Sequence, residues 1–335
     1  MLYKDKTLAS HDAASPDRAA GATHSYFPAE TPALLSRLKS RLNDYFLLTK
    51  PTIILLVLFT GATALFIEGS FVREPLKFSL VLLGLYLTGG AASALNQYFE
   101  RELDAQMPRT QTRRPLPQGK ISPAHALTFS LVIGIAGVAL FGFVFNWLTA
   151  MLSLTTILFY SLIYTLLLKP NTPQGVVIGG AAGAIAPVGA WAAATGTMEL
   201  APWLLFLIIF IWTPPHFWAL ALIYKDDYEK TGLPMMPVVK GETSTLNQII
   251  GYTVLLFVAS LSLLFTGTGG VLYLSASLAL GGWFIKKAFE AKAQRTVEAY
   301  RSLFGFSIVY LFTLFIALII DSFLKPLTAM IAHIG

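Results

Sequence analysis

The chain has 335 residues, of which 55% are hydrophobic and only 13% are charged, and it contains no cysteine. Soluble proteins are about 25% charged on average, so this composition excludes an ordinary soluble enzyme and favours a polytopic membrane protein. The absence of cysteine excludes thiol catalysis, disulfide scaffolds and iron–sulfur clusters. The net charge of +6 could also indicate a nucleic-acid partner, so the positions of the basic residues must decide between these classes.

The first 42 residues differ in character from the rest of the chain. Residues 1–30 are rich in Ala, Ser, Asp and Pro without periodicity, which predicts a disordered cytoplasmic tail and neither a signal nor a transit peptide. In residues 31–46, Leu34, Leu38, Leu42 and Phe46 recur every four residues with basic residues between them. This pattern predicts either an interfacial helix or a simple extension of the first membrane span. Residues 43–335 are expected to form one transmembrane domain.

Nine stretches are apolar and long enough, at about 20 residues, to cross a bilayer as α-helices. They predict an all-α bundle with spans near residues 45–67, 77–99, 124–145, 147–168, 175–195, 201–223, 247–267, 269–288 and 302–324. With the N-terminus in the cytoplasm, 21 of the 24 Lys and Arg residues lie on the cytoplasmic side, all except Arg73, Lys77 and Lys325. This asymmetry follows the positive-inside rule, places the C-terminus in the periplasm and explains the basic charge without nucleic acid.

An acidic window follows the second expected span. Asn96, Glu100 and Asp104 are four residues apart, so on a continuous helix their side chains project from one face. Mg²⁺ is usually held by one or two carboxylates together with waters and substrate phosphate oxygens. The positive-inside rule explains basic residues at the end of a span but not acidic ones. The three residues therefore favour a magnesium site over an ordinary membrane-edge loop.

The loop after this window is basic and stiffened by prolines. Guanidinium groups bind phosphate oxygens through paired hydrogen bonds, which makes the loop a candidate diphosphate site. An ordinary cytoplasmic loop would carry similar charges, so the basic residues alone do not decide between the two. The candidate ligands are Arg109, Arg113, Arg114 and Lys120.

A second acidic window, Tyr224-Lys225-Asp226-Asp227-Tyr228, follows the sixth expected span. On a helix Asp226 and Asp227 point to different faces, so at most one of them joins a given metal directly. We assign Asp227 to the metal, both aspartates to the catalytic set, and Lys225 to the diphosphate.

The sixth span contains Pro214 and Pro215, which predict a break or kink inside the membrane. His216 follows them directly and is the only histidine in the core of an expected span. An ionisable side chain at this depth indicates a functional role.

Several motifs together resemble the UbiA superfamily of intramembrane prenyltransferases, and within it the haem O synthase branch. The resemblance covers residues 43–325, and the stretch from Thr213 to Trp218 followed by Lys225–Tyr228 is what narrows it to that branch. The chain departs from the family in having Glu100 where Asp is common and a basic loop one residue longer, so either Arg113 or Arg114 matches the family arginine. The motifs are Leu48-Thr49-Lys50-Pro51, Asn96–Glu100–Asp104, Arg109-Thr110 to Pro117, Val177–Ala184, Trp212-Thr213-Pro214-Pro215-His216-Phe217-Trp218, Tyr224–Tyr228 and Pro234-Met235-Met236-Pro237.

The resemblance implies that a farnesyl group passes from farnesyl diphosphate to a vinyl group of haem b, with Mg²⁺ as cofactor and haem O as product. It implies further that Lys50 contacts the diphosphate and that His216 contacts haem. Aromatic faces can stabilise an allylic cation, and the candidate pocket residues are Tyr98, His216, Phe217, Trp218, Tyr224 and Tyr228.

Two other functions remain open from the sequence. One is a prenyltransferase acting on a quinone precursor such as 4-hydroxybenzoate, and the other is a transporter with a broken sixth helix. If the function is farnesyl transfer to haem b, we expect a bacterial inner-membrane protein in a lipid bilayer, with haem A synthase or terminal-oxidase assembly factors as downstream partners.

Overall fold

The computed structural model describes residues 31–332, and the predicted tail at residues 1–30 lies outside them. Within these residues the chain divides into two units, a smaller one that ends at Ser40 and a larger one that begins at Arg41. Every regular element within residues 31–332 is helical, which confirms the all-α prediction. The helices of the first half are α1 (Thr31–Leu48), α2 (Pro51–Glu68), η1 (Ser70–Arg73), α3 (Pro75–Phe99), α4 (Arg101–Gln106), α5 (Pro108–Gln111), α6 (Pro123–Leu140), η2 (Phe141–Phe145), α7 (Trp147–Leu158), η3 (Phe159–Leu168) and α8 (Lys169–Asn171).

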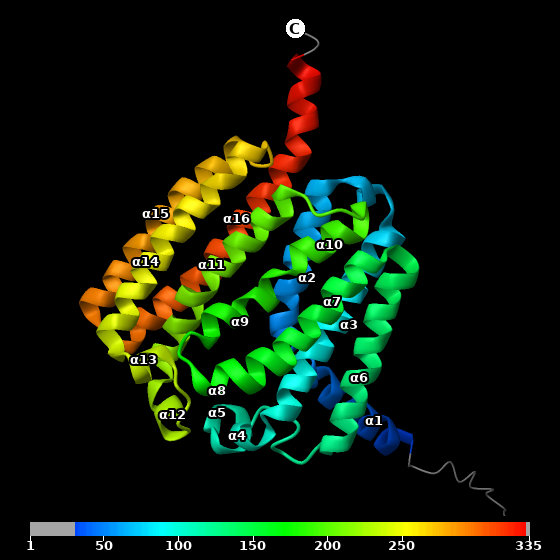
Figure 1. The fold of residues 1–335 in the computed structure, drawn as a ribbon, viewed down its shortest axis with the longest axis vertical. Helices are drawn as coiled ribbons and strands as arrows, with labels where there is room; N and C mark the ends of the chain where they lie inside the picture. The colour runs from blue at the N-terminus through cyan, green and yellow to red at the C-terminus, as the bar shows by residue number, and fades with distance from the viewer. Residues whose placement is uncertain (1–30, 333–335) are drawn as a thin grey trace, which may run out of the picture. The chain divides into compact units, whose positions relative to one another are not determined.

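The second half adds the helices that complete the larger unit. They are α9 (Gly175–Ala184), α10 (Ala186–Thr195), α11 (Leu200–Ile223), α12 (Lys225–Lys230), α13 (Met236–Val239), α14 (Gly241–Leu261), η4 (Ser262–Thr266), α15 (Val271–Gln294) and α16 (Val297–Ala332). Figure 1 shows α11, α14, α15 and α16 packed side by side, with α3, α6 and α7 on the opposite side and α2, α9 and α10 between the two groups.

Eight helical segments in residues 31–332 are long and apolar enough to span a membrane. The ninth expected span, 269–288, forms α15, but Lys286 and Lys287 and several Ser and Gly residues keep its hydropathy below that of the other eight. It nevertheless runs beside α14 and α16 over its whole length (Figure 1).

Three other expectations need correction. The first span begins at Pro51 and not at residue 45, because α1 ends at Leu48 and Lys50 adopts a left-handed conformation, so α1 is a separate helix. The fifth span is divided into α9 and α10 at Ile185, just before the helix-starting Pro187. The sixth span is not broken, since α11 continues through Pro214 and Pro215.

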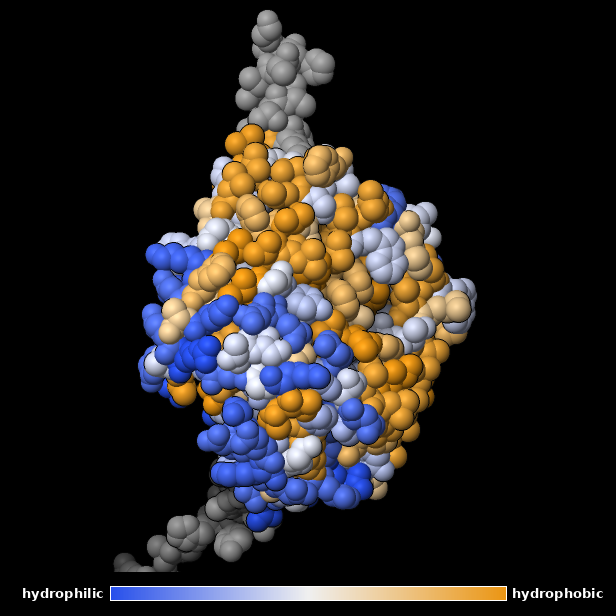
Figure 2. Space-filling model, turned by 60° about the vertical axis from the view of Figure 1, so that its left-hand side comes forward, coloured by the Kyte–Doolittle hydropathy of each residue, from blue (hydrophilic) through white to orange (hydrophobic). Residues whose placement is uncertain are grey.

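Polar side chains gather at one end of the larger unit. The short helices α4, α5, α12 and α13 all lie there (Figure 1), and Figure 2 shows hydrophilic side chains at that end below a broad apolar surface. The two acidic windows expected from the sequence therefore come to the same end of the helical bundle.

Candidate active site

The first acidic window keeps its helical register past the end of α3. The Glu100 amide donates to the Asn96 carbonyl over 2.9 Å, and the Asp104 amide donates to the Glu100 carbonyl over 2.8 Å. The three side chains are therefore on one face, as their spacing predicts, and all three are buried. Each of them contacts a basic side chain. We call this group of six residues the polar head: Asn96, Glu100, Asp104, Lys50, Arg114 and Lys169.

The carboxylates of the polar head are paired with cations from other elements. Lys169, at the start of α8, lies 2.5 Å from Glu100 through its Nζ and Oε1. Arg114 binds Asp104 through Nη1, and the same nitrogen lies 3.6 Å from Glu100 Oε2. The head is thus a compact arrangement of alternating charges in which no carboxylate lies apart from a base.

Asn96 links the head to two further helices. Its Oδ1 accepts a hydrogen bond from the ammonium of Lys50, and its Nδ2 donates to Thr165 Oγ1 over 3.0 Å. Thr165 in turn donates to the Tyr160 carbonyl over 2.8 Å. Both residues belong to the π-helical turns of η3. A π-helical segment often marks a functional site, because its register depends on tertiary contacts of this kind.

The charges of the head control its ionisation. Burial alone would raise the pKa of Glu100, but Lys169 and Lys50 overcome this effect and lower the pKa to about 2. Burial, reinforced by the nearby Arg114, lowers the pKa of Lys50 to about 7. Burial raises the pKa of Asp104, while Arg114 opposes that change. Glu100 therefore stays ionised at neutral pH although it is buried.

The predicted metal ligands are partly brought together. Asn96, Glu100 and Asp104 share the head, whereas Asp227 lies on α12 and is partly exposed. Within residues 31–332 no group of three His, Cys, Asp or Glu residues is arranged to hold a metal. The donor set still suits Mg²⁺, because one amide and two carboxylates supply oxygen and Glu100 Oε2 is buried without a hydrogen-bond partner.

Arg109, on α5, contacts the second acidic window. Its Nη2 donates to the Tyr228 hydroxyl over 3.3 Å, and its guanidinium carbon lies 4.8 Å from the ring centre of Tyr224 and 5.9 Å from that of Tyr228. Its Nε is buried without a partner. On α12, Asp226 is exposed and Lys225 pairs with Glu229 at 3.3 Å.

The other predicted diphosphate ligands differ in position. The Arg114 side chain is 20% exposed and lies in the polar head. Arg113 and Lys120 are exposed and are not part of it. The structure thus brings Lys50 and Arg114 together in the polar head, places Arg109 against Tyr224 and Tyr228 of the second window, and leaves Arg113 and Lys120 exposed.

Three predicted aromatic residues are not at the head. Tyr98 packs beside the buried Leu48 cluster, with the Arg101 guanidinium carbon 5.0 Å from its ring centre. Phe217 is 40% exposed, and Trp218 is fully buried against Tyr252, with 5.4 Å between ring centres.

His216, on α11, contacts α16. Its ring stacks on Trp212 at 4.3 Å and on Phe304 at 4.6 Å between ring centres. Its Nδ1 is 2.7 Å from Ser307 Oγ, and that hydroxyl donates to the Phe304 carbonyl over 2.6 Å. Nδ1 of His216 therefore has a hydroxyl partner, and Nε2 is the ring nitrogen on the other side of the imidazole.

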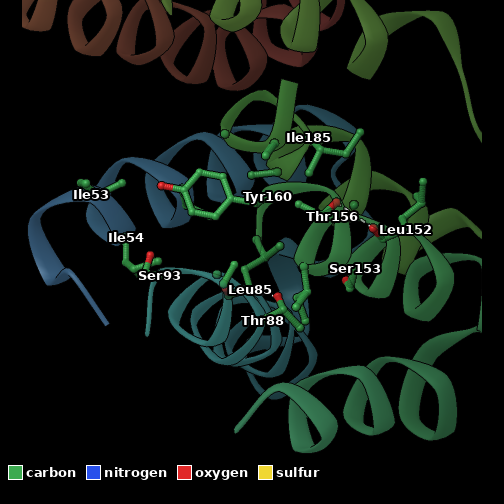
Figure 3. A pocket seen from close by; sticks show the side chains of 18 residues that line it. Ile53, Ile54, Leu85, Thr88, Ser93, Leu152, Ser153, Thr156, Tyr160 and Ile185 are labelled. Carbon is green, nitrogen blue, oxygen red and sulfur yellow. Dashed lines mark hydrogen bonds between the residues drawn. The ribbon is translucent and has the colours of Figure 1, made fainter. Parts of the chain in front are cut away.

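An apolar pocket, open on one side, begins one helical turn from the polar head. Ile53 and Ile54 follow Lys50 on α2, Ser93 precedes Asn96 on α3, and Tyr160 reaches into the space from η3 (Figure 3). The remaining walls come from α7, α9 and α10, whose lining residues include Leu152, Ser153, Thr156, Gly183, Ile185 and Gly189. The pocket can take an isoprenoid chain whose polar end lies at the head.

Lys169, Tyr160 and Thr165 were missed by sequence reasoning. In the sequence, Lys169 entered only the comparison of basic residues on the two sides of the membrane. Tyr160 and Thr165 lie inside an apolar span and carried no prediction. A signal was present, because Tyr160, Tyr164 and Lys169 recur at intervals of four and five residues towards the C-terminal end of that span. Tyr160 and Tyr164 stack with 5.1 Å between their ring centres.

A membrane bundle with a buried head of carboxylates and cations above an apolar pocket defines an intramembrane prenyltransferase. The UbiA prenyltransferase family model matches residues 57–319, and the chain belongs to this family. It is 45% identical over 289 residues to the protein named protoheme IX farnesyltransferase of Erythrobacter litoralis (strain HTCC2594), covering 85% of this chain and 94% of that protein.

Solved structures share the fold at low sequence identity. A structure of digeranylgeranylglyceryl phosphate synthase has a TM-score of 0.71 at 20% identity, covering 84% of this chain and 99% of that one. A UbiA homolog from Archaeoglobus fulgidus bound to GPP and Mg²⁺ has a TM-score of 0.55 at 15% identity, covering 82% of this chain and 99% of that one.

Proposed function

We propose that this enzyme transfers the farnesyl group of farnesyl diphosphate to a vinyl group of haem b, that water adds to the resulting carbocation with loss of a proton, and that diphosphate and haem O are released, the latter for haem-copper terminal oxidases. The observation that carries this proposal is the polar head directly beside an apolar pocket. The choice of farnesyl and haem rests on the similarity to the protoheme IX farnesyltransferase of E. litoralis.

The polar head fits the departure of diphosphate. Breaking the C–O bond of an allylic diphosphate develops negative charge on the leaving oxygens. Lys50, Lys169 and Arg114 are already gathered and partly desolvated, so they would stabilise this charge. Tyr160, the aromatic residue of the pocket wall, would present its ring to the allylic cation.

Asn96, Glu100 and Asp104 would hold Mg²⁺, with Asp226 and Asp227 on α12 completing the proposed catalytic set. When bound, the metal would neutralise part of the diphosphate charge. The carboxylates now pair with cations of the head. We therefore propose that these cations turn to the diphosphate when the metal takes the carboxylates, with Arg109 and Lys225 approaching from the second window.

For the haem acceptor we propose His216 as an iron ligand. Ser307 contacts Nδ1, so Nε2 is the ring nitrogen that would bind iron, and a hydrogen bond to the other nitrogen is the usual way in which a metal-binding imidazole is oriented. Titrating ferric haem into the wild-type protein and into His216→Ala tests this, because loss of an axial histidine shifts the Soret band. An unchanged spectrum and affinity would remove His216 from the proposal.

The enzyme is a multi-pass membrane protein. We propose further that it lies in a bacterial inner membrane with its N-terminus in the cytoplasm, and that haem O passes to haem A synthase or terminal-oxidase assembly factors.

The deciding experiment mixes the purified protein in detergent with farnesyl diphosphate, haem b and Mg²⁺. The expected result is diphosphate release and a haem product with added farnesyl mass and water, both abolished by EDTA and restored by excess Mg²⁺. Prenylation of 4-hydroxybenzoate without haem turnover would instead support the quinone-precursor enzyme. No turnover of any prenyl diphosphate would support a transporter.

A further inference from the structure

The corner between α1 and α2 holds Lys50 in an unusual backbone conformation. Its φ is 53° and its ψ is 64°, and within residues 31–332 the only other non-glycine residue with positive φ is Arg295. This left-handed conformation is unfavourable for a residue with a Cβ atom, and Lys50 also precedes Pro51, which restricts it further. Other contacts must therefore hold the corner in place.

Gln97 on α3 supplies those contacts. Its Nε2 donates to the carbonyls of Leu47 and Leu48, both over 3.0 Å. These are the last two carbonyls of α1, where intrahelical donors run out, and the Leu47 carbonyl also accepts from the Lys50 amide over 3.2 Å. Both partners are acceptors, so the NH₂ end of the amide must face them. Gln97 is only 1% exposed, so the two bonds are shielded from water.

Thr49 completes the packing of the corner. Its hydroxyl donates to the Phe46 carbonyl over 2.7 Å and lies 3.3 Å from the Tyr86 hydroxyl. Thr49 can approach α3 closely because Gly90 faces it, where an added Cβ would lie 3.2 Å from Thr49 Cγ2. We call Thr49, Lys50, Gln97 and Gly90 the corner clamp.

Neighbouring residues of α3 act on the two ends of the same lysine. Gln97 holds the backbone just before Lys50, and Asn96 accepts from its ammonium. Gln97 does not line the apolar pocket and does not contact the charged groups of the head. We propose that Gln97 is a positioning residue, which fixes the corner clamp so that the Lys50 ammonium meets the substrate diphosphate. This proposal rests on the proposed function of the polar head.

A double-mutant cycle on the full-length protein separates positioning from a general structural role. The readout is the affinity for radiolabelled farnesyl diphosphate with Mg²⁺ and without haem, compared among wild type, Gln97→Met, Lys50→Met and the double variant. Gln97→Met should weaken binding about fivefold, as expected for lost hydrogen bonds to the corner. In the Lys50→Met background the same change should have no further effect.

Gly90→Ala gives a second test if Gln97→Met does not fold. Its methyl group would push on Thr49 and should weaken farnesyl diphosphate binding only while Lys50 is present. Equal losses with and without Lys50, or unchanged affinity in a folded Gln97→Met protein, would overturn the proposal. This readout does not depend on transfer to haem. If the wild-type protein binds farnesyl diphosphate but forms no prenylated haem, the proposed acceptor is wrong and the proposal for the corner clamp is unaffected.

Discussion

Glu100 illustrates how a buried carboxylate depends on the nearest of its cationic neighbours. It is 6% exposed, and Lys169 is the cation closest to it. Removing one partner of a buried ion pair leaves an unpaired charge, which costs about 3 kcal/mol or more. Lys169→Met should therefore lower the thermal unfolding temperature and raise the pKa of Glu100 from about 2.

The matched control removes both charges. Lys169→Met combined with Glu100→Gln should recover most of the lost thermal stability but not the activity, because the neutral pair is no longer desolvated as ions. Thermal unfolding in detergent measures both proteins. A double variant as unstable as Lys169→Met would show that the ion pair does not account for the loss.

Two adjacent arginines provide a residue-scale test of the diphosphate site. Arg114 binds Asp104 in the polar head, whereas Arg113 is exposed on the outside of the loop. Arg114→Ala should lower kcat/KM for farnesyl diphosphate by about 100-fold, as is typical for removing one group that stabilises transition-state charge. Arg113→Ala should stay close to wild type in the same assay. A larger loss for Arg113 would place the diphosphate outside the head.

At the scale of elements, the sequence predicts what depends on spacing along one helix and fails where packing between helices decides. Asn96, Glu100 and Asp104 share a face because the helical repeat places them there. The π-helical turns of η3 were not predicted, since the hydrogen bond from Thr165 to the Tyr160 carbonyl forms where Thr165 also binds Asn96. Lys169 enters the site through this tertiary arrangement, and its spacing from Tyr160 and Tyr164 is the only local sign of it.

The apolar pocket between helices can be shortened without disturbing the bundle. Gly183 on α9 lines the pocket, and an added Cβ meets no atom within 4 Å. Gly183→Leu should therefore fill the pocket and lower kcat/KM for farnesyl diphosphate about tenfold or more. The kcat/KM for geranyl diphosphate, which is one isoprene unit shorter, should fall less.

Gly251→Leu on α14 is the matched control, because Gly251 also has open space around its Cβ position but does not line the pocket. It should leave the kinetics of both substrates unchanged. Equal losses for the two substrates in Gly183→Leu would show that the isoprenoid chain lies elsewhere.

At the scale of the whole molecule, hydropathy was a reliable guide because every backbone polar group in a bilayer must be bonded within a helix. The span ends predicted from hydropathy were wrong where a side-chain contact decides where a helix ends. Residues 45–48 are part of α1 and not of the first span, because Gln97 caps α1 and Lys50 turns the chain before Pro51. α15 is the other exception, since its charged end leaves eight and not nine segments that qualify by composition within residues 31–332.

Whether α15 crosses the membrane can be measured directly, because the chain contains no cysteine and single introduced cysteines are unambiguous. Phe265 is exposed near the turn before α15, and Gln294 is the exposed last residue of α15. If α15 spans, a membrane-impermeant maleimide should label Phe265→Cys in intact spheroplasts and Gln294→Cys only after permeabilisation. Ser70→Cys and Gln118→Cys serve as outside and inside references, since their loops flank α3 on opposite ends. Labelling of Phe265→Cys and Gln294→Cys from one side would show that α15 does not cross, and would move the end of α16 to the cytoplasmic side.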